Sequence, residues 1–125
     1  MNSNNYGTRE ACKRLVDAGI VLETDQQWYI LKNGDCYLSG ESVPMIEIVK
    51  EYPAPSMAEV WRELPEFIEH KDRIYNKCLV GYDGLNIASY DDNRILNYDD
   101  LCENTNPTDA LIDLLIWVSA QKERV

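Results

Sequence analysis

The stretch NPTDALIDLLIWV, residues Asn106–Val118, decides the fold of this chain. Asn106 is a preferred helix N-cap, Pro107 suits the first helical position, and Asp109 brings negative charge to the positive end of the helix dipole. Apolar residues then cover most of the helix circumference. They are Leu111, Ile112, Leu114, Leu115, Ile116, Trp117 and Val118. A helix of this kind is usually buried. We therefore expect it to form the centre of the core, so that Leu115→Asp, which leaves a charge in apolar surroundings, abolishes cooperative thermal unfolding.

A first helix is expected near the N-terminus. Thr8 can cap it, and the apolar positions that follow recur with a helical rather than a strand period, up to Ala18. Gly19 then predicts the end of the helix, because glycine adopts the left-handed conformation without a steric cost.

A second helix is expected in the middle of the chain. Ser56 and Glu59 stand three residues apart, the spacing of a capping box. Pro65 should end or kink this helix, because proline cannot continue the hydrogen-bond ladder. The apolar pair Phe67 and Ile68 suggests that the packing continues for another turn.

The first predicted hairpin joins Trp28–Leu31 to Cys36–Leu38. Asn33-Gly34 lies between them, and this dipeptide favours a two-residue turn in which both residues have positive φ. Met45–Val49, between two prolines, is a further strand or a loop.

The second predicted hairpin joins Arg73–Tyr82 to Leu85–Tyr90 through the turn Asp83-Gly84. One face of this pair is expected to be apolar and to join the core, since side chains alternate along a strand. That face would carry Ile74, Cys78, Val80, Leu85 and Ile87. Ile95–Tyr98 is a candidate for a short edge strand.

These elements predict an α+β fold. We expect an antiparallel sheet of about four strands, built from two hairpins, with about three helices packed mainly on one face. The length of 125 residues suits one domain. We place a disordered N-terminal tail at residues 1–7, the single α+β domain at 8–122 and a short tail at 123–125.

The charge is strongly acidic and unevenly distributed. The net charge of −10 argues against direct binding to a nucleic-acid backbone or an anionic membrane surface. Between residues 83 and 113, Arg94 is the one basic residue among eight acidic ones. This stretch is either a solvated face or a docking surface for a basic protein, with tyrosines as anchors. The candidate interaction surface consists of Asp83, Asp91, Asp92, Asp99, Asp100, Glu103, Tyr90 and Tyr98.

No motif for catalysis, cofactor binding or metal binding is present. His70 is the one histidine; the nearest thiol in sequence is Cys78, and no nucleophile signature surrounds it. The four cysteines form no close pair and are expected to be reduced thiols. A calcium loop starting at Asp91 fails, because Leu96 and Cys102 occupy its glycine and glutamate positions. We therefore predict no catalytic residue, no cofactor and no metal, and no apolar run reaches the roughly 20 residues of a membrane span.

Three motifs together carry a resemblance. They are TREACKRLVDAGI at Thr8–Ile20, PAPSMAEVWRELP at Pro53–Pro65 and NPTDALIDLLIWV at Asn106–Val118. In this order the chain resembles a group of small proteins of gut Bacteroidales and their phages or integrated elements. The group has no assigned activity, so no functional residue carries over. The resemblance implies a cytoplasmic accessory protein of a mobile element that acts on host machinery.

The sequence therefore favours a small acidic, non-enzymatic interaction module in the cytoplasm that binds a basic host protein. An enzyme with an unrecognised acidic site and a structural or assembly homo-oligomer are the alternatives. A carboxylate with a raised pKa in a pocket would favour the enzyme, and a concentration-independent oligomer would favour the assembly role.

Overall fold

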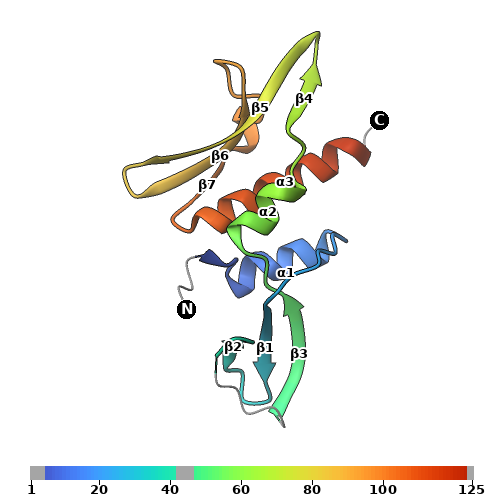
Figure 1. Ribbon diagram of the computed structural model, residues 1–125, viewed down its shortest axis with the longest axis vertical. Coiled ribbons are helices and arrows are strands. Elements are labelled where there is room, and N and C mark those ends of the chain that lie inside the picture. The colour runs from blue at the N-terminus through green and yellow to red at the C-terminus, as the bar shows by residue number, and fades with distance from the viewer. Residues whose placement is uncertain (1–4, 42–46, 124–125) are drawn as a thin grey trace.

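The computed structural model describes residues 5–41 and 47–123, and confirms the α+β fold (Figure 1). Two antiparallel sheets lie at opposite ends of an elongated molecule, with three α-helices between them. One sheet has the strand order β2-β1-β3 and the other β4-β5-β6-β7. In chain order the elements are α1 (Arg9–Asp17), β1 (Gln27–Leu31), β2 (Cys36–Leu38), β3 (Ile48–Pro53), α2 (Met57–Glu63), β4 (Phe67–His70), β5 (Arg73–Tyr82), β6 (Leu85–Asp91), the 3₁₀ turn η3 (Tyr98–Asp100), β7 (Cys102–Asn104) and α3 (Pro107–Glu123).

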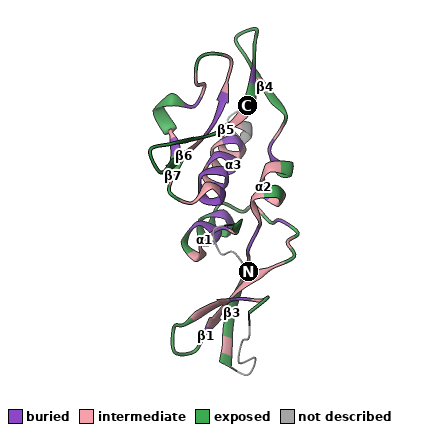
Figure 2. Ribbon diagram, turned by 60° about the vertical axis from the view of Figure 1, so that its left-hand side comes forward, coloured by how far each residue is buried: buried purple, intermediate pink, exposed green. Residues whose placement is uncertain are grey.

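The last helix forms the centre of the core, as its sequence predicts. Asn106 caps α3, because its side-chain oxygen accepts hydrogen bonds from the N–H groups of Thr108 (2.8 Å) and Asp109 (3.2 Å). Figure 2 shows α3 as the most continuously buried element, and α1, α2, β6 and β7 all contact it. Leu115 is among its buried residues.

The first helix begins and ends where the sequence predicts. The Thr8 hydroxyl accepts a hydrogen bond from the N–H of Ala11 (3.2 Å). Gly19 follows the helix with a φ of 78°, and the N–H of Ile20 then reaches back to the carbonyl of Leu15 (3.2 Å). This left-handed residue closes the helix in the way that a glycine stop does.

The second helix has its capping box, but the chain beyond it corrects the prediction. Ser56 and Glu59 exchange hydrogen bonds of 2.8 and 3.2 Å, and α2 ends at Glu63, before Pro65. Phe67 and Ile68 do not prolong the helix; they belong to strand β4, which pairs with β5. The turn between the two strands is Lys71-Asp72, with φ values of 50° and 63°. Two non-glycine residues with positive φ give little sequence signal for a hairpin.

The first hairpin forms as predicted, although its turn is wider. Gly34 has a φ of 94°, but Asn33 keeps a negative φ. The N–H of Leu31 donates to the carbonyl of Asp35 (2.8 Å), which leaves a three-residue loop between them. The strand predicted at Met45–Val49 is partly outside the described residues; β3 begins at Ile48. This hairpin and β3 form a sheet separate from the second hairpin.

The second hairpin has the predicted turn but the opposite core face. Asp83 and Gly84 take φ values of 50° and 78°, as a two-residue turn requires. The expected core residues Ile74 and Val80 are half-exposed, at 53% and 50%. The face that packs on α3 instead carries Tyr75, Leu79, Ala88 and Tyr90. Both faces of β5 are apolar, so alternation alone did not distinguish them.

The segment Ile95–Tyr98, predicted as an edge strand, does not form a strand but contacts β6 through one backbone hydrogen bond and the side chain of Asn97. Ile95 makes only an isolated bridge to Asp91. Asn97 is buried, and its amide oxygen accepts a hydrogen bond from the N–H of Tyr90 (3.0 Å) while its amide nitrogen donates to the carbonyl of Ala88 (3.4 Å). The N–H of Leu96 also donates to the carbonyl of Tyr90 (2.8 Å), so this segment binds the edge of β6 without forming a strand, and the edge strand of the sheet is β7.

Part of the predicted N-terminal tail is packed into the fold. Tyr6 forms a bridge with Ser56, and Gly7 is buried. The N–H of Gly7 donates to the carbonyl of Pro55 (3.0 Å), and the carbonyl of Gly7 accepts from the indole N–H of Trp28 (2.8 Å). The domain therefore begins before residue 8, and residues 1–4 lie outside the described part of the chain.

Candidate interaction surface

The predicted acidic residues do not form one cluster. Asp83 is exposed at the turn between β5 and β6, whereas Asp91 and Asp92 lie at the far end of β6. Asp91 accepts a hydrogen bond from the N–H of Asn93 (2.6 Å), and one oxygen of Asp92 forms an ion pair with Arg73 (3.4 Å). These two carboxylates thus have local structural contacts, and Asp83 stands apart from them by the length of a strand.

Two further acids of the stretch hold the helices together. Asp109 is buried and accepts hydrogen bonds from the N–H (2.8 Å) and the hydroxyl (2.7 Å) of Thr8. Burial raises the pKa of this carboxyl group. Asp113 forms an ion pair with Arg14 of α1 (3.0 Å). The formal charge of residues 83–113 therefore overstates what is free to meet a partner.

The two tyrosines of the candidate surface differ in burial: Tyr90 lies in the core and Tyr98 is exposed. Tyr90 is fully buried, and its hydroxyl donates to the carbonyl of Pro65 (2.6 Å). Burial raises its pKa, and the ring belongs to the core, so its assignment to the interaction surface is wrong. Tyr98 is 72% exposed in η3, next to Asp99 and Asp100, which are also exposed.

A groove lies between η3, β7 and α3, and we call it the η3–α3 groove. It encloses about 440 Å³. Asp100 and Asp113 are its two acids, and the half-buried side chains of Ile116 and Trp117 give it an apolar wall. The full lining is Asp100, Leu101, Cys102, Asp113, Ile116, Trp117, Ala120 and Gln121. The groove thus combines carboxylates with a large apolar surface. Sequence reasoning missed Ile116 and Trp117, because it assigned the whole apolar girth of α3 to the core.

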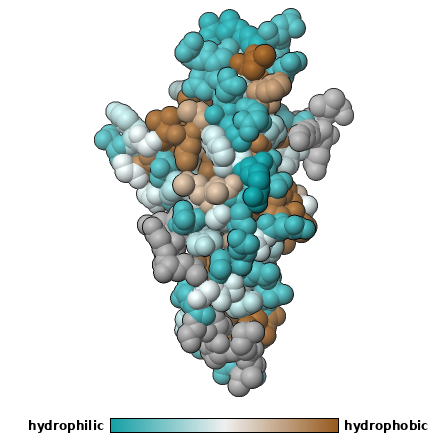
Figure 3. Space-filling model, viewed as in Figure 1, coloured by the Kyte–Doolittle hydropathy of each residue, from teal (hydrophilic) through white to brown (hydrophobic). Residues whose placement is uncertain are grey.

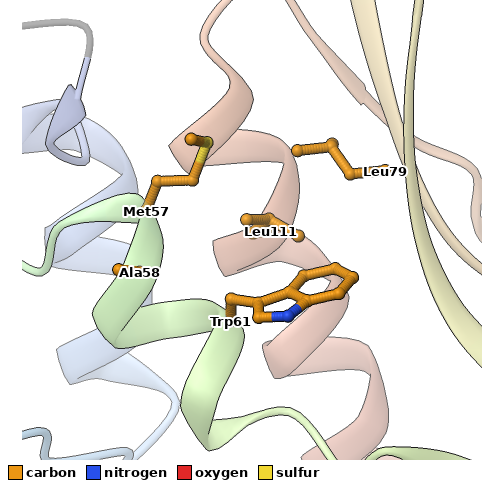
Figure 4. A pocket seen from close by; sticks show the side chains of 5 residues that line it. All are labelled: Met57, Ala58, Trp61, Leu79 and Leu111. Atoms are coloured by element: carbon orange, nitrogen blue, oxygen red, sulfur yellow. The ribbon is translucent and has the colours of Figure 1, made fainter.

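A second hollow, of about 360 Å³, lies between α2, α3 and β5. Figure 4 shows Met57, Ala58 and Trp61 on α2, with Leu111 of α3 and Leu79 of β5 opposite them. Figure 3 shows hydrophobic residues gathered on this side of the molecule, where β5 and β6 approach α2. This lining offers no acid, base or nucleophile.

The face of the four-stranded sheet that points away from α3 is also apolar, and we call it the outer face. Strand register places Phe67 of β4, Ile74, Val80 and Tyr82 of β5, and Leu85 and Ile87 of β6 on it. All except the half-buried Ile87 are exposed. The charged residues that share this face are Glu69, Asp91 and Glu103. The sequence analysis had assigned four of these apolar residues, Ile74, Val80, Leu85 and Ile87, to the core.

The described residues do not bring together the metal ligands or the Cys–His pair that the sequence was searched for. Among them, no group of three His, Cys, Asp or Glu side chains could hold a metal ion. His70 is exposed at the end of β4 and pairs with Arg73, five residues along β5 from Cys78. Five strand residues span about 16 Å, which is too far for a Cys–His pair.

No family model, curated protein or solved structure matches this chain. The likeness to small proteins of gut Bacteroidales and their phages therefore stays an expectation from the sequence. None of the helices in the described residues is long and apolar enough to cross a membrane.

Proposed function

We propose that this protein is a non-enzymatic interaction module whose η3–α3 groove binds a segment of another protein that carries basic side chains beside apolar ones. The observation that supports the proposal is the lining of the groove, in which Asp100 and Asp113 stand beside Ile116 and Trp117. The partner would be a basic protein of the host, and a mobile-element accessory role in the cytoplasm would follow from the resemblance of the sequence.

The charge of the groove suits a cationic partner. Asp99 and Asp100 are exposed, and neither forms an ion pair within the described residues. A Lys or Arg from a partner would therefore not have to displace an internal cation at η3. Such complementarity mainly accelerates encounter and selects the partner, and it weakens as salt screens it.

The apolar wall of the groove would supply contact area for a partner in addition to the attraction of the carboxylates. Trp117 and Ile116 are half-buried, so part of each side chain remains open to the groove. Tryptophan is common among the residues that dominate binding energy, and its ring also attracts cations. A segment with an apolar residue next to Lys or Arg fits both parts of the groove.

Capture from a host lysate with matched variants tests this proposal. The groove variant is Asp99→Asn/Asp100→Asn, which changes Asp100 of the groove lining and its exposed neighbour Asp99 in η3. The control is Asp17→Asn/Glu23→Gln, which removes the same charge from exposed positions in and after α1. We expect one basic protein to bind the wild type and the control, and to be lost from the folded groove variant. Equal capture by all three proteins would contradict a role for the groove.

Measurements on the purified partner then separate charge from apolar contact. We expect its affinity for the wild type to fall as salt rises, and Trp117→Ala to weaken it by about tenfold or more. If the affinity changes neither with salt concentration nor on Trp117→Ala, the partner binds elsewhere on the protein.

A further inference from the structure

Asn33-Gly34 is the one place in the sequence where glycine directly follows asparagine. The pair lies in the loop between β1 and β2, and both residues are exposed. Glycine has no Cβ atom, so its backbone nitrogen is less hindered toward a neighbouring group than that of any other residue. The space around Gly34 is open as well, because an added Cβ atom would have no neighbour within 4 Å. The loop thus sets an asparagine side chain beside a peptide nitrogen that no side chain shields.

The side chain of Asn33 is folded back along this loop. Its Oδ1 atom accepts a hydrogen bond from the N–H of Asp35 (3.0 Å), and its Nδ2 atom donates to Oδ2 of Asp35 (3.1 Å). The ring that the first bond closes contains the nitrogen of Gly34, so the carboxamide carbon of Asn33 is held on the side of that nitrogen. The N–H of Asp35 also points at the oxygen that would gain negative charge if this carbon were attacked.

We propose that Asn33 is a site of spontaneous deamidation. The nitrogen of Gly34 loses its proton and attacks Cγ of Asn33. The N–Cγ bond forms, the Cγ–Nδ2 bond breaks, and Nδ2 leaves as ammonia after it takes up the released proton. The cyclic imide that results then adds one water molecule. Opening at Cγ gives aspartate at position 33, and opening at the backbone carbonyl gives isoaspartate, in which the main chain runs through the side-chain carbonyl.

One hydrogen bond of the loop opposes the reaction. The N–H of Gly34 donates to the carbonyl of Leu31 (2.9 Å), and this bond must open before the nitrogen can attack. Exposed loops open locally without unfolding the rest of a protein. We therefore expect Asn33 to react more slowly in the native chain than in the unfolded chain, but faster than the other asparagines of the native chain.

Deamidation would loosen the β1–β2 hairpin and leave the η3–α3 groove unchanged. The donor that Asn33 offers to Asp35 would be replaced by a carboxylate, so that two like charges face each other. Isoaspartate would also lengthen the main chain of the loop by one carbon atom. The bond from the N–H of Leu31 to the carbonyl of Asp35 (2.8 Å) closes the loop and would weaken first. The hairpin lies at the other end of the molecule from η3 and β7 (Figure 1).

Peptide mapping by mass spectrometry tests the site on the purified full chain, kept folded in warm, mildly alkaline buffer. We expect the mass gain of deamidation to appear at Asn33 about tenfold or more faster than at Asn93, with both aspartate and isoaspartate as products. Asn93 is the matched comparison within the same chain, because it is exposed in the bend after β6 but precedes Arg94. The same chain in urea should convert at Asn33 faster still.

A variant separates this reaction from other effects of ageing. Asn33→Gln keeps a carboxamide but would require a larger ring, so conversion at position 33 should be lost. Amide hydrogen exchange at Leu31 should become about tenfold faster in the aged wild type, and should stay unchanged in aged Asn33→Gln.

Two results would overturn the proposal. One is a native chain in which Asn33 stays intact while it converts in urea, and the other is conversion of Asn33 and Asn93 at the same rate. Unchanged exchange at Leu31 after conversion would refute the loosening of the hairpin. None of these measurements uses a partner in the η3–α3 groove, so the proposed function stands or falls separately.

Discussion

Thr8 and Asp109, 101 positions apart in the chain, are joined by two hydrogen bonds. The backbone N–H and the hydroxyl of Thr8 donate to the two carboxylate oxygens of Asp109, at 2.8 and 2.7 Å. Thr8 is the N-cap of α1, and Asp109 lies in the first turn of α3. One buried carboxylate thus fixes the start of the first helix against the start of the last.

Loss of this carboxylate should destabilise the protein. Asp109→Ala leaves two donors of Thr8 without their partner, so we expect the free energy of unfolding in urea to fall by about 2 to 4 kcal/mol at neutral pH. Asp109→Asn keeps an acceptor and a similar volume, and should cost less. Equal losses in the two variants would mean that packing, rather than hydrogen bonding, is what Asp109 supplies.

The same residue should give stability a distinct pH dependence. Burial, the main cause, raises the pKa of Asp109 in the folded state, so the native protein holds this proton more tightly than the unfolded chain does. Its contribution is therefore fully present below the unfolded pKa of about 4 and is lost as pH rises through the folded pKa. The free energy of unfolding should be measured for the wild type and for Asp109→Asn from about pH 4 upward. The wild type should lose stability relative to Asp109→Asn as the pH rises. Parallel pH curves would contradict the raised pKa.

Gly7 should not tolerate a side chain. A Cβ atom at this position would lie 2.5 Å from Cδ1 of Ile112 and 3.0 Å from Sγ of Cys12, both in the core. Gly7→Ala should therefore lower the unfolding free energy by about 1 to 3 kcal/mol through overpacking. Gly81→Ala is the control, because its nearest neighbour would be an amide oxygen at 3.8 Å. If both substitutions cost the same, backbone freedom and not space is the cause.

Lys77 should stabilise the C-terminal end of α2 by binding its last carbonyl groups. Its ammonium group, on a side chain that is 4% exposed, donates to the carbonyls of Trp61 (2.7 Å) and Leu64 (3.3 Å) and lies 4.4 Å from the centre of the Trp61 ring. Lys77→Met keeps the aliphatic chain and removes the donors, so we expect a loss of about 1 to 3 kcal/mol in urea unfolding. Lys13→Met, on the exposed side of α1, should change little.

The four free cysteines should divide into two classes of reactivity. Burial raises the pKa of both Cys12 and Cys102 to about 12, whereas Cys36 and Cys78 are half-exposed. Because the thiolate is the reactive form, a disulfide reagent at about pH 8 should label two thiols rapidly in the native protein and four after unfolding. Labelling of all four at one rate in the native state would show that the core opens readily.

The helices could be predicted because their signals are local. Thr8, Ser56 and Asn106 each bind an N–H group within three residues along the chain, so the capping pattern is legible without the fold. The pairing of β1 with β2 and of β5 with β6 was predicted from their turns, but the pairing of β4 and of β7 was not. The β4–β5 turn contains no glycine, and Asn97 completes the edge of β6 through a side chain that no strand pattern reveals.

The candidate site shows the same division. Tyr90 and Tyr98 are chemically identical and eight residues apart, and only the packing of β6 against α3 decides that Tyr90 belongs to the core while Tyr98 is exposed. Alternation in β5 defined two apolar faces but not which of them meets α3. The sequence shows that the stretch is acidic. Only the fold shows that Asp109 and Asp113 make internal contacts while Asp99 and Asp100 are exposed.

The central place of α3 also governs when the chain can fold during its synthesis. α1, α2, β6 and β7 all pack on a helix that is translated after them. At about 5 to 20 residues per second, Thr8 waits roughly 5 to 20 s for Asp109 to be made. During that interval the nascent chain exposes the apolar surfaces that α3 will cover, so its vulnerability to proteases and its need for chaperones should end only when the last helix leaves the ribosome.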